Sequence, residues 1–254
     1  MSDIVTEHDG HIRTIQLNRP AKKNAMTSSM YIAMADALHD AAKDDQTRVV
    51  LWHGAGHSFT AGNDLEDFMK NPPEPGDSPQ AQLINALIDF EKPLVAAVQG
   101  VAIGGGTTML AHCDFVYAGE SAKFQLPFVN LGLVPEFGSS YLLPLRFGYV
   151  RAAELVLLGQ PFDAARAAEL GLVTQVVPDQ ALLATATETA RKLAEKPTGA
   201  LQACKRLMRR TSREQLEQAV KFENEEFAAR VSSAEAKEAF TAFFEKRARA
   251  HHTQ

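Results

Sequence analysis

The sequence predicts an α/β protein, because short apolar strand segments alternate with helical patterns up to about residue 125 and helical patterns dominate beyond residue 135. The runs Ile4 to Glu7 and Ile12 to Leu17 alternate in polarity around Asp9-Gly10, which is typical of a β-hairpin. The continuous apolar runs Val49 to Trp52 and Leu94 to Val98 are typical of buried strands. Two strands and a helix recur loosely in this half, without a sequence repeat of fixed length.

The first helix is expected to begin after Thr27, whose hydroxyl is placed to cap it. Apolar residues recur behind this cap at helical spacing, namely Met30, Met34, Leu38 and Ala41. The other elements expected in this half are helices over 80–90 and 104–112, strands over 115–118 and 122–125, and a proline-rich surface loop over 71–79.

The second half is expected to be mainly helical, with one short strand at Val173 to Val177. Helical patterns cover 136–146, 151–158 and 163–170 and then continue almost unbroken to Ala250. The last segments carry two apolar faces, one with Leu216, Val220, Phe227 and Val231, the other with Ala236, Phe240, Phe243 and Phe244. This surface needs a cover, which either the N-terminal part of the chain or another subunit would provide.

The composition of the 254-residue chain is that of a soluble globular protein, with 45% hydrophobic residues, 22% charged residues and a net charge of −5. The lack of a basic excess argues against a nucleic-acid partner. No apolar run approaches the roughly 18 residues of a membrane span, and the N-terminus lacks a signal-peptide layout. Two cysteines are too few for a disulfide framework, and no metal-ligand spacing occurs. We therefore expect a cytoplasmic protein without a membrane or metal partner.

Two loops of small residues follow buried strands. The segment His57 to Leu65 has accessible backbone N–H groups at its centre, and its Asp64 is placed to cap the next helix. The segment Gly100 to Thr108 contains Gly104-Gly105-Gly106, which would leave N–H donors open at the start of a helix. It matches neither a P-loop nor a dinucleotide fingerprint. Taken alone, each loop is more typical of a close-packed turn than of a binding site.

Glu136 is a candidate general base, because the apolar residues Pro135, Phe137 and Phe128 around it would raise the pKa of its carboxyl. The alternative is structural. Proline at the first helical position followed by glutamate is a common helix start, and the local sequence favours that interpretation.

Together, in this order, the segments resemble the crotonase superfamily of acyl-CoA enzymes (enoyl-CoA hydratase/isomerase), from about Ile4 to Arg249. The motifs that carry the resemblance are Asn18-Arg19-Pro20, Asn24-Ala25-Met26, Phe59 to Leu65, Gly100 to Gly106 and Cys113 to Ala118. The resemblance favours a functional role for both glycine-containing loops.

The resemblance implies a crotonase (ClpP-like) spiral of ββα units over 1–195 and a C-terminal α-helical trimerisation region over 196–254. It implies a homotrimer or a dimer of trimers with an acyl-CoA substrate. Coenzyme A is then part of the substrate, and no separate cofactor is expected. The backbone N–H groups of Ala61 and Gly105 would form an oxyanion hole for the thioester oxygen. The residues expected to bind substrate are Lys22, Thr60, Gly62, Asn63, Asp64, Leu65, Thr108 and Phe128.

The reaction is indicated by what stands at the family's acid–base positions. Hydratases that the chain resembles have two glutamates, where this sequence has Thr108 and Phe128. The segment Asn130 to Ser140 resembles instead the isomerase branch with a single catalytic glutamate, here Glu136. We therefore expect isomerisation of a 3-enoyl-CoA to a 2-trans-enoyl-CoA, with Phe128 beside the acyl chain.

Three alternatives stay open at this stage. A hydratase could arrange its water differently, and another crotonase-type reaction could use the same oxyanion hole. The chain could also be a non-catalytic subunit that binds CoA esters. The length of the acyl chain, and whether the pocket admits a ring, are not encoded in a readable motif.

Overall fold

The computed structural model describes residues 2–71 and 78–252, with side chains described up to Glu245. Most of the surface loop expected over 71–79 lies outside the described residues. In the described part of the chain, no helix is both long and apolar enough to cross a membrane.

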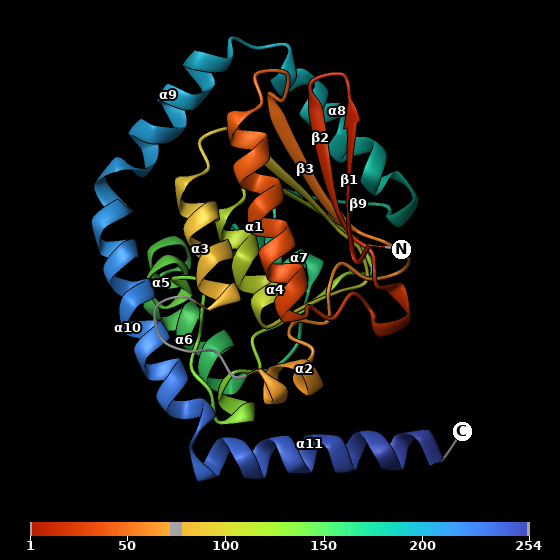
Figure 1. Cartoon of the computed structure of the whole chain (residues 1–254), viewed down its shortest axis with the longest axis vertical. Helices are drawn as coiled ribbons and strands as arrows, with labels where there is room; N and C mark the ends of the chain where they lie inside the picture. Colours follow the sequence, from red (N-terminus) through yellow and green to blue (C-terminus); the bar gives the residue numbers. More distant parts are fainter. Residues whose placement is uncertain (1, 72–77, 253–254) are drawn as a thin grey trace.

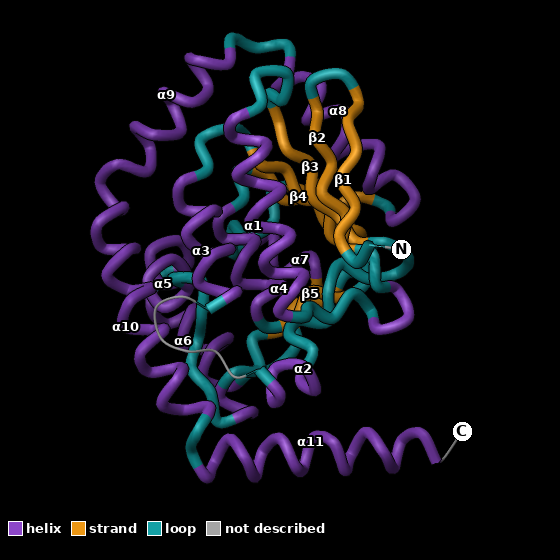
Figure 2. Tube along the Cα trace, viewed as in Figure 1, coloured by secondary structure: helices purple, strands orange, loops and turns teal. Residues whose placement is uncertain are grey.

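A six-stranded sheet forms the centre of the molecule, in the order β1-β2-β3-β4-β6-β9 (Figures 1 and 2). Its strands are β1 (Ile4–Asp9), β2 (Ile12–Leu17), β3 (Val49–Gly54), β4 (Leu94–Val98), β6 (Phe115–Gly119) and β9 (Gln175–Val177). The β1–β2 pair is antiparallel and every later pair is parallel. The hairpin and the buried strands expected from the sequence are thus confirmed.

A second, three-stranded sheet stands beside the first in the order β5-β7-β8. Its strands are β5 (Val101–Ile103), β7 (Lys123–Gln125) and β8 (Phe162–Asp163). Successive strands alternate between the sheets, since β4 and β6 belong to the large sheet while β5 and β7 belong to the small one. Strand β5 was not expected, because it is only three residues long and lies inside a glycine-rich segment.

Helices cover both faces of the large sheet. Side chains alternate along a strand, so Val50 and Trp52 of β3 face one way while Val49 and Leu51 face the other. The first pair packs in the main core with α1 (Ser28–Lys43) and α3 (Pro79–Asp89), and the second packs against α8 (Leu182–Ala194). Figure 1 shows α1 and α3 on the side of the sheet opposite α8. Thr27 caps α1 through the N–H of Met30, as expected.

Helices dominate the rest of the chain. They are α2 (Leu65–Lys70), α4 (Gly105–Thr108), α5 (Ser139–Phe147), α6 (Tyr149–Leu158), α7 (Ala164–Glu169), α9 (Thr198–Arg209), α10 (Arg213–Val231) and α11 (Ala234–His252), with short 3-10 turns between several of them. Helices α9 and α10 form a long outer arm, and α11 crosses below the domain (Figure 1).

The apolar faces of the last helices are largely covered by their own chain. Phe227 of α10 and Phe240 of α11 are buried and both make edge-on contacts with Phe68 of α2. Phe243 is the exception, with 42% of its surface exposed. The sequence left open whether this apolar surface is covered by the same chain or by another subunit. In the structure the same chain covers most of it.

The helix expected over 136–146 begins later. Phe137 and Gly138 both have left-handed backbone conformations, with φ of +65° and +67°, and α5 starts only at Ser139. The interpretation of Pro135-Glu136 as a helix start is therefore wrong. Glu136 lies in a turn before the helix, which leaves its side chain free to point elsewhere.

Candidate active site

The two glycine-containing loops lie side by side. Thr60 donates its N–H to Val101 O at 3.0 Å and accepts from the N–H of Ile103 at 3.1 Å, which joins the first loop to β5. Gly62 has a φ of +84°, and a Cβ there would stand 2.6 Å from Ile103 O. Only glycine fits this position, so the close approach of the two loops is built into the sequence.

The N–H of Ala61 is already used within the first loop. It donates to the carbonyl oxygen of Lys23 at 2.9 Å, on the side away from β5. A donor held in this bond is not free to bind a thioester oxygen. The structure thus disagrees with the choice of Ala61 as an oxyanion-hole residue, and the reason is the direction of its peptide N–H.

Asn63 provides an open N–H in the same loop. The N–H of Met26 donates to Gly62 O at 2.8 Å, and the N–H of Asp64 donates to Met26 O at 2.8 Å. In this parallel bridge Asn63 itself therefore turns its N–H to the opposite side. No described residue accepts a hydrogen bond from it.

Gly105 provides a second open N–H. It is the first residue of α4, where a helix leaves its N–H groups without intrahelical partners. The preceding N–H, of Gly104, donates to Gln125 O at 2.9 Å, whereas that of Gly105 has no acceptor among the described residues. This prediction from the sequence fits the geometry.

The carboxyl of Glu136 faces this point. Its Oε1 lies 2.8 Å from where a Cβ on Gly105 would stand, and the hydroxyl of Tyr31 lies 3.2 Å from the same position. Glu136 is 4% exposed, and its Oε1 has no hydrogen-bond partner among the described residues. Burial, and after it the charge of Glu223, raises the pKa of Glu136 to about 8.

Tyr31 links the open donor loop to the carboxyl. Its hydroxyl donates to Asn63 Oδ1 at 2.6 Å, and its side chain is fully buried on α1. Burial, and after it the charge of Glu136, raises the pKa of the Tyr31 phenol, so the hydroxyl stays protonated at neutral pH. Tyr31 was not expected in the site from the sequence, because a tyrosine on the buried face of a helix has no local signal that separates it from a core residue.

Thr108 and Phe128 offer no acid–base group. The hydroxyl of Thr108 is buried and bonds back to the carbonyl oxygens of Gly104 at 3.4 Å and Gly105 at 3.3 Å. Phe128 is buried, and its ring lies 4.0 Å from where a Cβ on Gly104 would stand. Phe128 thus contributes an apolar wall near the glycine turn.

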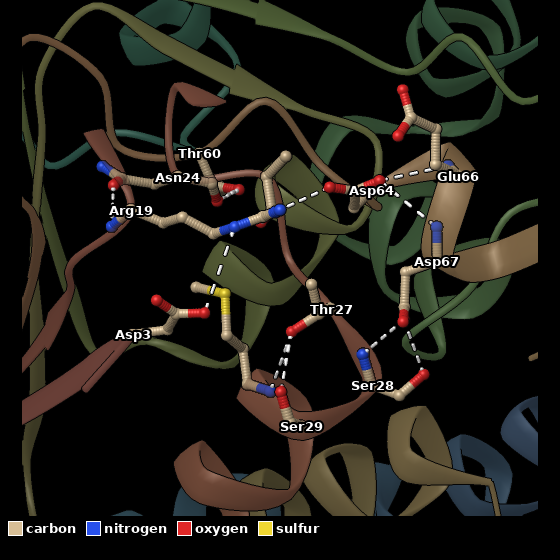
Figure 3. A network of polar contacts seen from close by, with 12 residues as sticks. Asp3, Arg19, Asn24, Thr27, Ser28, Ser29, Thr60, Asp64, Glu66 and Asp67 are labelled. Atoms are coloured by element: carbon tan, nitrogen blue, oxygen red, sulfur yellow. Dashed lines mark hydrogen bonds and ion pairs between the residues drawn. The ribbon is translucent and has the colours of Figure 1, made fainter. Parts of the chain in front are cut away.

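Thr60 and Asp64 brace the first loop. Thr60 Oγ1 donates to Asn24 O at 2.7 Å, and Asp64 accepts from Arg19 at 2.6 Å while it caps α2 (Figure 3). Leu65 packs partly buried against the main core, and Lys22 is exposed. The described residues contain no group of three or more His, Cys, Asp or Glu side chains that could hold a metal ion.

Comparison with known proteins places this arrangement in a family. The chain matches the family described as Enoyl-CoA hydratase/isomerase over residues 7–254. The 1,2-epoxyphenylacetyl-CoA isomerase of Escherichia coli (strain K12) is 36% identical over 254 residues, with 97% of each chain covered. Enoyl-CoA delta isomerase 2 of Rattus norvegicus is 37% identical over 219 residues, with 84% of this chain and 56% of the rat protein covered. Relatives also include hydratases.

The fold is shared as well. The crystal structure of an enoyl-CoA hydratase/isomerase from Pseudoalteromonas atlantica T6c matches with a TM-score of 0.93 and 42% identity, covering 96% of this chain and 98% of that one. This match confirms the α/β crotonase fold expected from the resemblance. The chain belongs to the enoyl-CoA hydratase/isomerase family of the crotonase superfamily and is an acyl-CoA enzyme of that type.

Proposed function

We propose that this protein is an isomerase that converts 3-enoyl-CoA to 2-trans-enoyl-CoA, with Glu136 as the only proton shuttle. The observation that carries the proposal is the buried, unpaired carboxyl of Glu136 beside Gly105. The absence of a carboxylate at Thr108 and Phe128 adds to it. Among relatives, the rat enoyl-CoA delta isomerase 2 supports the same reaction class.

The oxyanion hole in this proposal consists of the N–H groups of Asn63 and Gly105, with Asn63 in place of Ala61. Both donors are fixed before charge develops on the thioester oxygen, and one such donor is worth about 10²- to 10³-fold in kcat. The CoA moiety would run along Lys22 and the segment from Ala61 to Leu65.

The chemistry then needs only one carboxylate. Glu136 removes a proton from C2 of the 3-enoyl thioester, and the electron pair moves into a dienolate held by the two N–H groups. The same carboxyl returns the proton to C4, so the double bond moves from C3–C4 to C2–C3 without net gain or loss of atoms. A base with a pKa near the working pH is suited to both transfers.

Hydration is the second reaction to test, because hydratases occur among the relatives. Adding water across a double bond requires a group that activates the water as well as one that handles the carbon-bound proton. Glu136 could serve as one of these two groups, but Thr108 and Phe128 cannot serve as the other. The proposed reaction is therefore isomerisation without hydration.

The experiment is a pair of assays on the purified protein, one with 3-hexenoyl-CoA and one with crotonyl-CoA. We expect the first to give the conjugated 2-enoyl thioester, seen by its ultraviolet absorbance, and the second to stay unhydrated. Formation of 3-hydroxybutyryl-CoA without isomerisation would replace the proposal with a hydratase. Thermal stabilisation by both esters without turnover would replace it with a non-catalytic CoA-ester binder.

A homotrimer or dimer of trimers built through residues 196–254, in the cytoplasm, is part of the same proposal. Large apolar side chains on the outer arm, Leu207, Met208 and Phe222, are 67%, 75% and 65% exposed. Light scattering of the purified protein would measure the subunit number.

A further inference from the structure

The turn that carries Glu136 has an unusual backbone. Phe137 follows Glu136 directly with a φ of +65°, and Gly138 continues with +67°. A residue with a side chain rarely adopts this left-handed conformation, so its surroundings must hold it there. The groups that hold the turn therefore determine where the carboxyl of Glu136 points.

Glu223 holds the turn from the C-terminal arm. Its side chain comes from α10 and is 6% exposed. Oε2 accepts the N–H of Gly138 at 2.6 Å, and Oε1 accepts the N–H of Ser140 at 2.7 Å. These N–H groups belong to the start of α5, which has no internal partner for them. One carboxylate on α10 thus binds both the turn, through Gly138, and the start of α5, through Ser140.

The same turn is held from the other side by His112. Nε2 of this buried imidazole donates to Phe137 O at 2.7 Å. Gly138 also packs directly on α10, because a Cβ there would stand 3.2 Å from a methyl carbon of Val220. The turn therefore has little space to relax if the hydrogen bond from His112 or those to Glu223 are lost.

We propose that Glu223 is a positioning residue for the reaction, which orients Glu136 by holding the N–H groups of Gly138 and Ser140. The proposal deepens the isomerase function proposed above and rests on it for the reaction. It assigns to the C-terminal helical region a role inside the active site of its own subunit, through α10.

Glu223 also acts on Glu136 through charge. The titratable groups that interact with Glu136 through charge are Tyr31 from α1 and Glu223 from α10. His112, from the 3-10 turn after α4, contacts the next residue, Phe137. Burial lowers the pKa of His112 to about 3, and Tyr31 stays protonated, so Glu223 is the one member of this group that adds a negative charge. Burial raises the pKa of Glu223 itself to about 7, against the hydrogen bonds from Ser140 and Gly138.

The experiment compares three variants on the full chain. Glu223→Gln keeps the size of the side chain but loses the charge and one of the two acceptors. Glu223→Asp keeps the charge but is one methylene too short to reach both N–H groups. Glu225→Gln is the matched control, since Glu225 is exposed on the same helix. Each is measured for kcat and KM with 3-hexenoyl-CoA, for thermal melting, and for the titration of Glu136 by ¹³C NMR of carboxyl-labelled protein, assigned with Glu136→Gln.

We expect Glu223→Gln to lower kcat by about 10- to 100-fold, as for a misplaced catalytic group, with KM changed less than about threefold. The Glu136 titration should move to lower pH, because a neighbouring negative charge is gone. Glu223→Asp should lower kcat comparably while leaving the Glu136 titration raised. Glu225→Gln should match the wild type in every measurement.

The proposal is overturned if Glu223→Gln melts at a lower temperature but keeps the kcat and the Glu136 titration of Glu225→Gln, since Glu223 would then be a structural residue only. If the wild type shows no isomerase activity at all, the proposed function fails by itself. The Glu136 titration, which needs no substrate, would still show whether the charge of Glu223 raises the pKa of Glu136.

Discussion

Oε1 of Glu136 lies 2.8 Å from the position that a Cβ on Gly105 would occupy. The middle glycine of the triplet therefore faces the proposed base, and a methyl group there would press on the carboxyl and fill the space for the substrate. We expect Gly105→Ala to lower kcat/KM for isomerisation by about 100-fold or more, comparable with losing an oxyanion donor.

Gly199→Ala is the control for this substitution. Gly199 lies in α9, and nothing stands within 4 Å of a Cβ there. This variant should keep full activity and gain up to about 1 kcal/mol of stability from helix propensity. Equal activities of the two variants would contradict the placement of Gly105 in the site.

The pH dependence of the reaction should follow the Glu136 carboxyl. Because Glu136 must be deprotonated to accept a proton and its pKa is raised to about 8, kcat/KM should rise through that pH and level off above it. His112, with its pKa lowered to about 3, does not titrate in this range. The measurement is kcat/KM for 3-hexenoyl-CoA, and a flat profile from about pH 6 to 9 would show that another group is the base.

The stability of the fold should fall with rising pH, whereas the activity should rise. The unfolded chain releases a glutamate proton near about pH 4.3, whereas folded Glu136 and Glu223 hold theirs to about 8 and about 7. Between these values the folded state binds more protons, so the free energy of unfolding falls as the pH rises. Glu136→Gln removes the part of this pH-dependent loss of stability that Glu136 causes. The melting temperature of Glu136→Gln minus that of the wild type should therefore be higher at about pH 8 than at about pH 5. An unchanged difference would contradict the raised pKa of Glu136.

The outer arm is attached to the rest of the domain through Lys205. Lys205 of α9 donates to Asp114 at 2.7 Å and to Lys92 O at 2.9 Å, and Asp114 also accepts the N–H of Leu94 at 2.8 Å. Lys205→Met should cost about 2 kcal/mol in the free energy of unfolding, because it removes bonds to a charged donor at a mostly buried site. Urea denaturation measures this cost.

The control is Lys221→Met, at an exposed position of α10. It should change the free energy of unfolding by less than about 0.5 kcal/mol. A cost for Lys205→Met no larger than that of the control would contradict the bridge between α9 and the sheet.

Much of the sheet was predictable from local sequence. The Asp9-Gly10 turn and the buried apolar strands β3 and β4 depend on local patterns, and the cap at Thr27 depends on one side chain. The start of α5 was not predictable in this way. Contacts from Glu223, 85 residues away from Gly138, hold a turn where the local sequence favours a helix.

The candidate site was predictable in part. The order of motifs places the two glycine-containing loops together, as the structure shows, and it singles out Glu136. It does not show which peptide N–H points into the site. In a regular extended segment the N–H groups of Ala61 and Asn63 would point to the same side, but Gly62 between them has a φ of +84° and breaks that alternation. The N–H of Ala61 therefore points to Lys23, while that of Asn63 points away from Met26. Tyr31 enters the site because its hydroxyl reaches Asn63 of one loop and lies beside Gly105 of the other.

The rate of double-bond migration by Glu136→Gln, measured with purified protein and 3-hexenoyl-CoA, tests the role of Glu136 most directly. Glutamine keeps the size of the side chain but cannot take up the C2 proton. We expect kcat to fall by about 10²- to 10⁴-fold, the usual contribution of a positioned general base, while Glu225→Gln keeps the wild-type rate. A Glu136→Gln rate within about threefold of the wild type would contradict the assignment of Glu136 as the proton shuttle.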